Sequence, residues 1–65
     1  MKNHEKARWA ARRAEALEQE ARALTADRSG DWRALRKREE GATRLRREAG
    51  RFRSMAARWM PDEAA

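Results

Sequence analysis

The fold of this chain is decided by residues 7–24, ARWAARRAEALEQEARAL, and residues 35–59, LRKREEGATRLRREAGRFRSMAARW. In both stretches alanines and large apolar residues recur at alternating steps of three and four, which place them on one face of an α-helix. We call this face the seam. It consists of Ala7, Ala10, Ala14, Leu17, Ala21 and Leu24, followed by Leu35, Arg38, Ala42, Leu45, Ala49, Phe52, Ala56 and Trp59. The pattern predicts two helices that pack along a narrow apolar strip.

The residues between the two stretches predict a tight turn. Gly30 suits the left-handed conformation just past a helix end, and Asp31 suits the N-cap of the next helix. Pro61 prevents the second helix from extending further. We therefore expect an all-α fold, an antiparallel helical hairpin of the alanine-rich coiled-coil type. It forms one domain over residues 1–65, with helices at about 4–28 and 32–60, a turn at 29–31 and a frayed acidic tail at 61–65.

Gly41 and Gly50 lie inside the second predicted helix, where each costs about 1 kcal/mol relative to alanine. A three-helix alternative would break the chain at Gly41. The seam continues through both glycines without a change of phase, so we predict one continuous helix.

The two halves of the seam also predict how the helices align. With a turn near residue 31, small residues meet small ones, and large side chains fill the space between them. The expected pairs are Ala21 with Ala42, Ala14 with Ala49, Ala7 with Ala56, Leu17 with Leu45, Ala10 with Phe52, Asn3 with Trp59 and Leu24 with Arg38. Phe52 and Trp59 are then core residues, and Trp32 is expected to cap Leu24 and Leu35. Arg38 either reaches Asp27 or Glu20, sets the register, or extends its charged end to solvent.

A single hairpin of 65 residues is near the size at which one core is barely adequate. We therefore expect a homodimer that forms a four-helix bundle. This plan resembles the Rop family of plasmid copy-number regulators, helical hairpins that dimerise into a four-helix bundle and bind paired RNA loops. The resemblance lies in length, turn placement and seam. It carries over no functional residue, and this chain differs in being strongly basic.

Positive charge on the second helix is the main indication of function. The chain has 17 Lys and Arg residues against 11 Asp and Glu, a net charge of +6. Eight residues away from the seam form a second series at steps of three and four, which we call the basic column. It consists of Arg33, Lys37, Glu40, Arg44, Arg47, Arg51, Ser54 and Arg58. Six cations on one side of a rigid rod predict a surface for the phosphates of a nucleic acid, whereas a solvated helix face usually mixes both signs.

The predicted register also concentrates charge at the open end of the hairpin, where residues 1–14 lie beside residues 47–60. Nine basic residues meet two acidic ones there, a net charge of +7, whereas residues 15–46 carry only +1. Trp9 lies off the seam among Arg8, Arg12 and Arg13. An exposed indole in this setting predicts base stacking or a protein contact, and burial in the dimer is the alternative. These four residues join the six cations of the basic column as the predicted nucleic-acid-binding residues.

The residue types exclude several other functions. His4 is the only histidine, near the chain terminus, and there is no cysteine, tyrosine or glycine-rich phosphate loop. We expect no enzyme activity, metal, cofactor or small-molecule substrate. Eleven acidic residues and a seam made mostly of alanine argue against a membrane-surface helix, and no segment predicts a membrane span or signal peptide. The sequence thus predicts a cytoplasmic regulator that binds RNA, slightly preferred, or DNA. The alternative is an accessory, inhibitor or antitoxin-like module whose basic, Trp-bearing end docks on an acidic protein.

Overall fold

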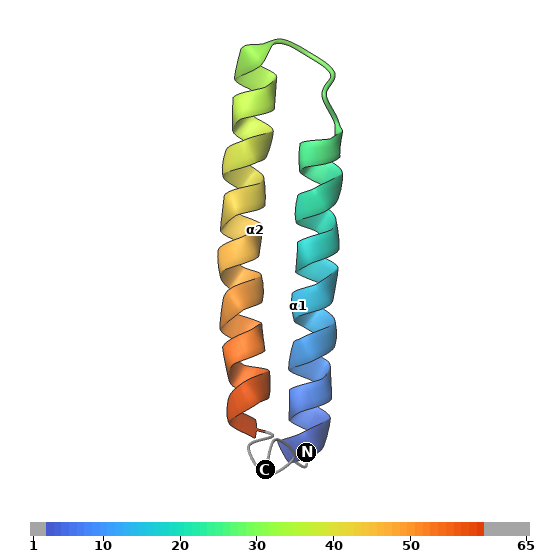
Figure 1. Ribbon diagram of the computed structural model, residues 1–65, viewed down its shortest axis with the longest axis vertical. Coiled ribbons are helices and arrows are strands. Elements are labelled where there is room, and N and C mark those ends of the chain that lie inside the picture. Colours follow the sequence, from blue (N-terminus) through green and yellow to red (C-terminus); the bar gives the residue numbers. More distant parts are fainter. Residues whose placement is uncertain (1–2, 60–65) are drawn as a thin grey trace.

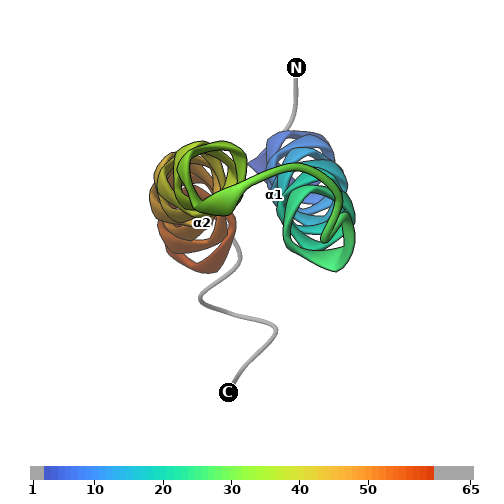
Figure 2. The same ribbon diagram turned by 90° about the horizontal axis from the view of Figure 1, so that it is seen from above.

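The protein is a helical hairpin, described over residues 3–59 by a computed structural model. Helix α1 spans Asn3–Ala26 and helix α2 spans Trp32–Trp59. The two helices run antiparallel and side by side in one layer, so that the first residues of α1 and the last residues of α2 lie at the same end of the rod (Figures 1 and 2). The hairpin measures 48 × 19 × 13 Å. The predicted all-α hairpin is confirmed, and α2 is continuous through Gly41 and Gly50.

Helix α1 ends two residues earlier than the sequence predicts. The carboxylate of Asp27 accepts hydrogen bonds from the backbone N–H of Ser29 (3.0 Å) and from its hydroxyl (2.6 Å). Asp side chains that bond the backbone two residues on favour turns over helix, so residues 27–31 form the link. The expected helical residue 60 and acidic tail 61–65 lie outside the described residues.

The link is held by the side chain of Arg38. Its Nη1 donates to the carbonyls of Asp27 (3.1 Å) and Ser29 (2.5 Å), and its Nε lies 3.5 Å from Asp27 Oδ2. Of the three predicted roles of Arg38, the contact with Asp27 is the one observed. Hydrogen bonds from Ser29, with the nearby charge of Arg38, lower the pKa of Asp27. The stability that these contacts contribute is therefore present at neutral pH and is lost as the pH falls through the lowered pKa of Asp27.

The start of α2 has the predicted turn chemistry. Gly30 has a φ of +88°, in the left-handed region. Asp31 accepts the backbone N–H of Ala34 at its Oδ1 (3.0 Å) and that of Leu35 at its carbonyl (3.1 Å), as an N-cap residue does.

Two glycine substitutions are expected to change stability in opposite directions. Gly30→Ala should lower the free energy of unfolding by about 1–2 kcal/mol, because an L-residue is strained at this φ. The new Cβ would also lie 3.0 Å from the Cβ of Ala34. Gly50→Ala should raise the free energy of unfolding by about 0.5–1 kcal/mol, because nothing lies within 4 Å of a Cβ at this helical position. Urea unfolding of each variant measures these changes in the free energy of unfolding. A Gly30→Ala variant as stable as the wild type would contradict the left-handed turn at this residue.

The alanines of the seam form the buried core. The fully or almost fully buried residues are Ala7, Ala10, Ala14, Leu17, Ala21, Ala42 and Ala49. Leu45 and Phe52 pack against the cluster of Ala14, Leu17 and Ala49, which agrees with the predicted pairing of Ala14 with Ala49 and of Leu17 with Leu45. The seam therefore aligns the helices through close backbone contact at small residues.

The large members of the seam are less buried than predicted. Leu17, 3% exposed, is the largest side chain in the core. Phe52 and Trp59, predicted as core residues, are only half-buried, as are the remaining seam residues Leu24, Leu35, Arg38, Leu45 and Ala56. Two helices that pack together cover a narrow strip of alanines between them. A large side chain extends beyond this strip, so one side of it stays in contact with solvent. In the hairpin alone, the large apolar groups thus stay partly uncovered.

Candidate nucleic-acid interface

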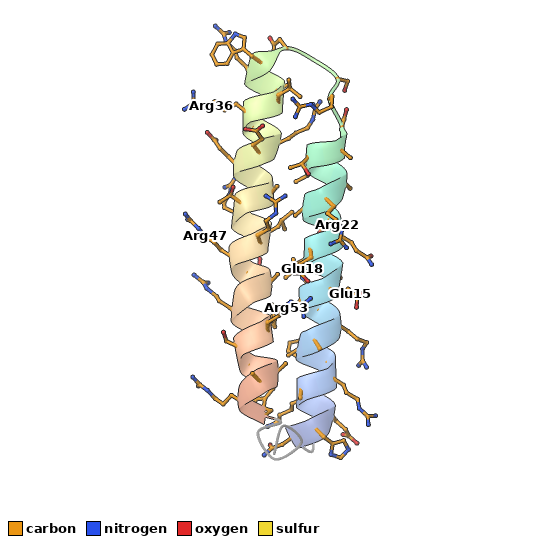
Figure 3. All side chains as sticks on the ribbon, in the orientation of Figure 1. Glu15, Glu18, Arg22, Arg36, Arg47 and Arg53 are labelled. Atoms are coloured by element: carbon orange, nitrogen blue, oxygen red, sulfur yellow. The ribbon has the colours of Figure 1, made fainter. Side chains whose placement is uncertain are left out.

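The basic column lies on the side of α2 that faces away from α1. All eight of its residues are exposed, and the Arg47 side chain extends outward from the rod (Figure 3). The column is opposite the seam because its members lie about half a helical turn from Ala42 and Ala49. Packing of the alanines against α1 therefore directs the column to solvent.

The acidic residues of the hairpin do not neutralise the column. Within residues 3–59, none of its six cations lies within 4.0 Å of a carboxylate. The ion pairs there involve other arginines: Arg28 with Glu39, Arg36 with Glu40, Arg38 with Asp27 and Arg53 with Glu18. Glu40, the one acid of the column, is thus held by Arg36 at 3.5 Å. The positive charge of the column remains available to an anionic ligand.

Neighbouring arginines of the column frame two shallow hollows. One has a volume of about 370 Å³ and is lined by Glu40, Thr43, Arg44 and Arg47. The next has a volume of about 270 Å³ and is lined by Arg44, Arg47, Glu48 and Arg51. Because Arg44 and Arg47 border both hollows, they form the centre of a strip where anionic groups can lie between guanidinium groups.

The open end of the hairpin is basic, although one of its arginines is already engaged. Arg53 donates from Nε to Glu18 Oε2 (3.3 Å) and from Nη2 to Glu18 Oε1, which links α2 to α1 (Figure 3). This hydrogen-bonded pair lowers the pKa of Glu18 and raises the pKa of Arg53. Arg53 therefore stabilises the helix pair and contributes little charge to the open end.

The structure separates the arginines of α1 from the basic column. Ala10 and Ala14 are buried against α2, and Arg12 lies two residues from each of them. Its side chain therefore points away from α2, to the edge of the hairpin formed by α1. Arg8 lies on the same outer side, and Arg13 lies between this side and the helix contact. All three are exposed. The predicted binding residues of the two helices thus belong to different surfaces of one hairpin.

Trp9 is exposed on one side and packs against its own hairpin on the other, a contact that the sequence did not predict. Its side chain is 45% exposed. Its ring meets Phe52 edge-on, with centroids 5.4 Å apart and planes at 81°. Next to this pair, Lys6 Nζ lies 5.8 Å from the centre of the Trp59 ring. Trp9 therefore belongs to an aromatic cluster on one side of the hairpin.

Trp32 is more open to solvent than a cap over Leu24 and Leu35 would suggest. Its side chain is 64% exposed, the highest value among the large apolar residues described. It is the first residue of α2, and the guanidinium of Arg33 lies 5.4 Å from the centre of its ring. Trp32, Arg33, Arg36, Lys37 and Glu40 line a hollow of about 280 Å³ at the end of the basic column. The sequence signal for this site is an aromatic residue directly before the first cation of the column.

Other kinds of site find little support in the described part of the chain. Between residues 3 and 59, no group of three His, Cys, Asp or Glu side chains is placed to hold a metal ion. Neither α1 nor α2 combines the length and apolar character needed to cross a bilayer. No family model matches the chain, and comparisons with curated proteins and with solved structures find no similar protein.

Proposed function

We propose that the protein is a non-enzymatic regulator that binds nucleic acid through the phosphate backbone, with RNA slightly preferred over DNA. The observation that carries this proposal is the exposed basic column of α2, six cations without a carboxylate partner among residues 3–59. Arginine binds phosphate with two parallel hydrogen bonds, and each phosphate neutralised releases condensed counterions.

The length of the column favours a duplex. Lys37 and Arg58 are separated by 21 helical residues, about 32 Å along the axis, which is close to one turn of a double helix. Heptad neighbours such as Arg44 and Arg51 lie about 10 Å apart. A straight row of cations can follow a backbone without entering the major groove, so it reads shape rather than base sequence.

The dependence of affinity on salt tests this proposal. For a duplex that contacts four to six cations of the column, we expect log Kobs to fall against log salt with a slope of about −3.6 to −5.4. Fluorescence anisotropy with RNA and DNA duplexes of the same sequence measures the slope and the preference. A slope near zero, or no binding at low salt, would contradict phosphate recognition. Co-purification with one acidic protein and no nucleic acid would instead favour a protein-interaction module, with Trp9 as its exposed contact.

We further propose that the protein acts as a homodimer, a four-helix bundle in which a second copy covers one side of the hairpin. This apolar side carries the large residues that the hairpin leaves partly exposed: Trp9, Leu24, Leu45, Phe52, Met55 and Trp59. Trp9 is 45% exposed and Met55 is 38% exposed. A core made mainly of alanines buries little apolar area, and burial of these side chains would add the missing stability.

The charges beside this apolar side favour an antiparallel dimer. Arg13 lies four residues after Trp9, and Glu20 lies four residues before Leu24, so all four follow one face of α1. If α1 packs antiparallel on the partner's α1, Trp9 lies over the partner's Leu24 and Arg13 lies opposite the partner's Glu20. If α1 packed parallel on the partner's α1, each of these charges would instead lie opposite its own copy, which is unfavourable.

An antiparallel dimer would also enlarge the binding surface. A two-fold axis across the rod places α2 beside the partner's α2, so both basic columns lie on the same side of the bundle. It also places each basic open end beside the nearly neutral turn end of the partner. The resulting surface would be two helices wide and long enough for one turn of a duplex.

A further inference from the structure

The hollow at Trp32 differs from the rest of the basic column in its aromatic wall. The two hollows farther along the column are lined by charged and small polar side chains, but here an indole that is 64% exposed forms one side. Structural roles at this end are filled by other residues, since Asp31 caps α2 and Arg38 holds the link. The high exposure of a large apolar ring favours a role in binding.

The charges around Trp32 indicate the kind of ligand. The guanidinium of Arg33 lies 5.4 Å from the ring centre. Lys37 and Arg36 line the same hollow, and its one acid, Glu40, is 3.5 Å from Arg36. The hollow therefore combines an exposed aromatic surface with at least two cations that no carboxylate occupies within residues 3–59. This combination suits a flat ring attached to a phosphate.

We propose that the Trp32 hollow binds one unpaired nucleotide, with its base stacked on the indole and its phosphate held by Arg33 and Lys37. Every base has a π-face, so such stacking tolerates any sequence. The hollow lies at the turn end of the column, in line with Arg44 and Arg47. This inference rests on the proposed binding of nucleic acid by the column, and it assigns the turn end to a loop, bulge or strand end next to a bound duplex.

Two probes with a common stem separate this inference from the proposed function. One is an RNA hairpin whose stem ends in a loop of unpaired nucleotides, and the other is the same stem as a blunt duplex. Trp32→Ala should weaken binding of the looped RNA about tenfold, within the range for loss of one base–aromatic stack. Its affinity for the blunt duplex should change less than twofold. The salt slope should be unchanged on both probes, because no charge is removed.

Conservative variants distinguish stacking from general apolar contact. Trp32→Phe should keep most of the affinity for the looped RNA, whereas Trp32→Leu should lose it as the alanine variant does. Circular dichroism should show the wild-type helix content in all three variants, and if the alanine variant unfolds, the leucine variant still gives the comparison. Equal effects on both probes, or none on the looped RNA, would overturn the inference while the duplex result stands. If the wild-type chain binds neither probe, the proposed function itself fails, and the Trp32 site fails with it.

Discussion

Replacement of Arg44, Arg47 and Arg51 by glutamine is expected to weaken duplex binding about 500-fold at 0.1 M salt. These residues occupy the centre of the basic column and line its two middle hollows. Loss of three phosphate contacts should make the slope of log Kobs against log salt less steep by about 2.7, and at 0.1 M salt this corresponds to a factor of about 500. Fluorescence anisotropy at several salt concentrations measures both quantities.

A matched variant distinguishes the column from net charge. Arg8, Arg12 and Arg22 are exposed residues of α1, and their replacement by glutamine removes the same number of charges. Arg8 and Arg12 lie on the edge of the hairpin opposite the column. Because the hairpin is 19 Å wide and charges are screened over about 10 Å at 0.1 M salt, this variant should lose much less affinity. Equal losses in the two variants would show that net charge, and not the column, governs binding.

Helix α2 should keep its structure in the glutamine variant of the column. Arg44, Arg47 and Arg51 are exposed and make no ion pair among residues 3–59. Glutamine and arginine have similar helix propensities. Unchanged circular dichroism would therefore assign the loss of affinity to the binding surface.

Sequence periodicity predicted the parts of the fold that depend on backbone approach. Alanine every seventh residue fixes where two helices can come close, and the observed cluster of Ala14, Leu17 and Ala49 follows from it. The positive φ of Gly30 and the N-cap role of Asp31 were predicted equally well, because each depends on local backbone chemistry.

Features that depend on side-chain direction were harder to predict. The spacing rule places Phe52 and Trp59 on the seam, but it does not say how far a large ring extends beyond an alanine strip that two helices cover. The high exposure of Trp32 was not predicted, because the direction of its side chain depends on where the link turns into α2. For the same reason the sequence did not predict that Arg8 and Arg12 lie on a different surface from the basic column. That prediction requires the orientation of both helices.

Trp9→Ala is expected to weaken the proposed dimer roughly a thousandfold. Buried tryptophans at interface centres commonly contribute about 2 kcal/mol or more, and a two-fold dimer contains this residue twice. Trp32→Ala is the matched control, because it removes an exposed indole outside the apolar side and should leave the dissociation constant of the dimer unchanged. Sedimentation equilibrium measures both variants. A wild-type chain that is a stable, helical monomer at micromolar concentration would rule out the four-helix bundle.

The orientation of the dimer can be tested by exchanging two charges. In an antiparallel dimer Arg13→Glu alone places like charges opposite each other at two symmetric contacts, which should weaken association about tenfold at low salt. The double variant Arg13→Glu with Glu20→Arg restores opposite charges at both contacts and should recover the wild-type dissociation constant. If α1 packed parallel on the partner's α1, each residue would face its own copy and like charges would meet in the wild type and in both variants, so Arg13→Glu would not weaken association. Loss of affinity in the single variant followed by recovery in the double variant therefore requires α1 to lie antiparallel on its partner, the arrangement that places both basic columns on one side of the bundle.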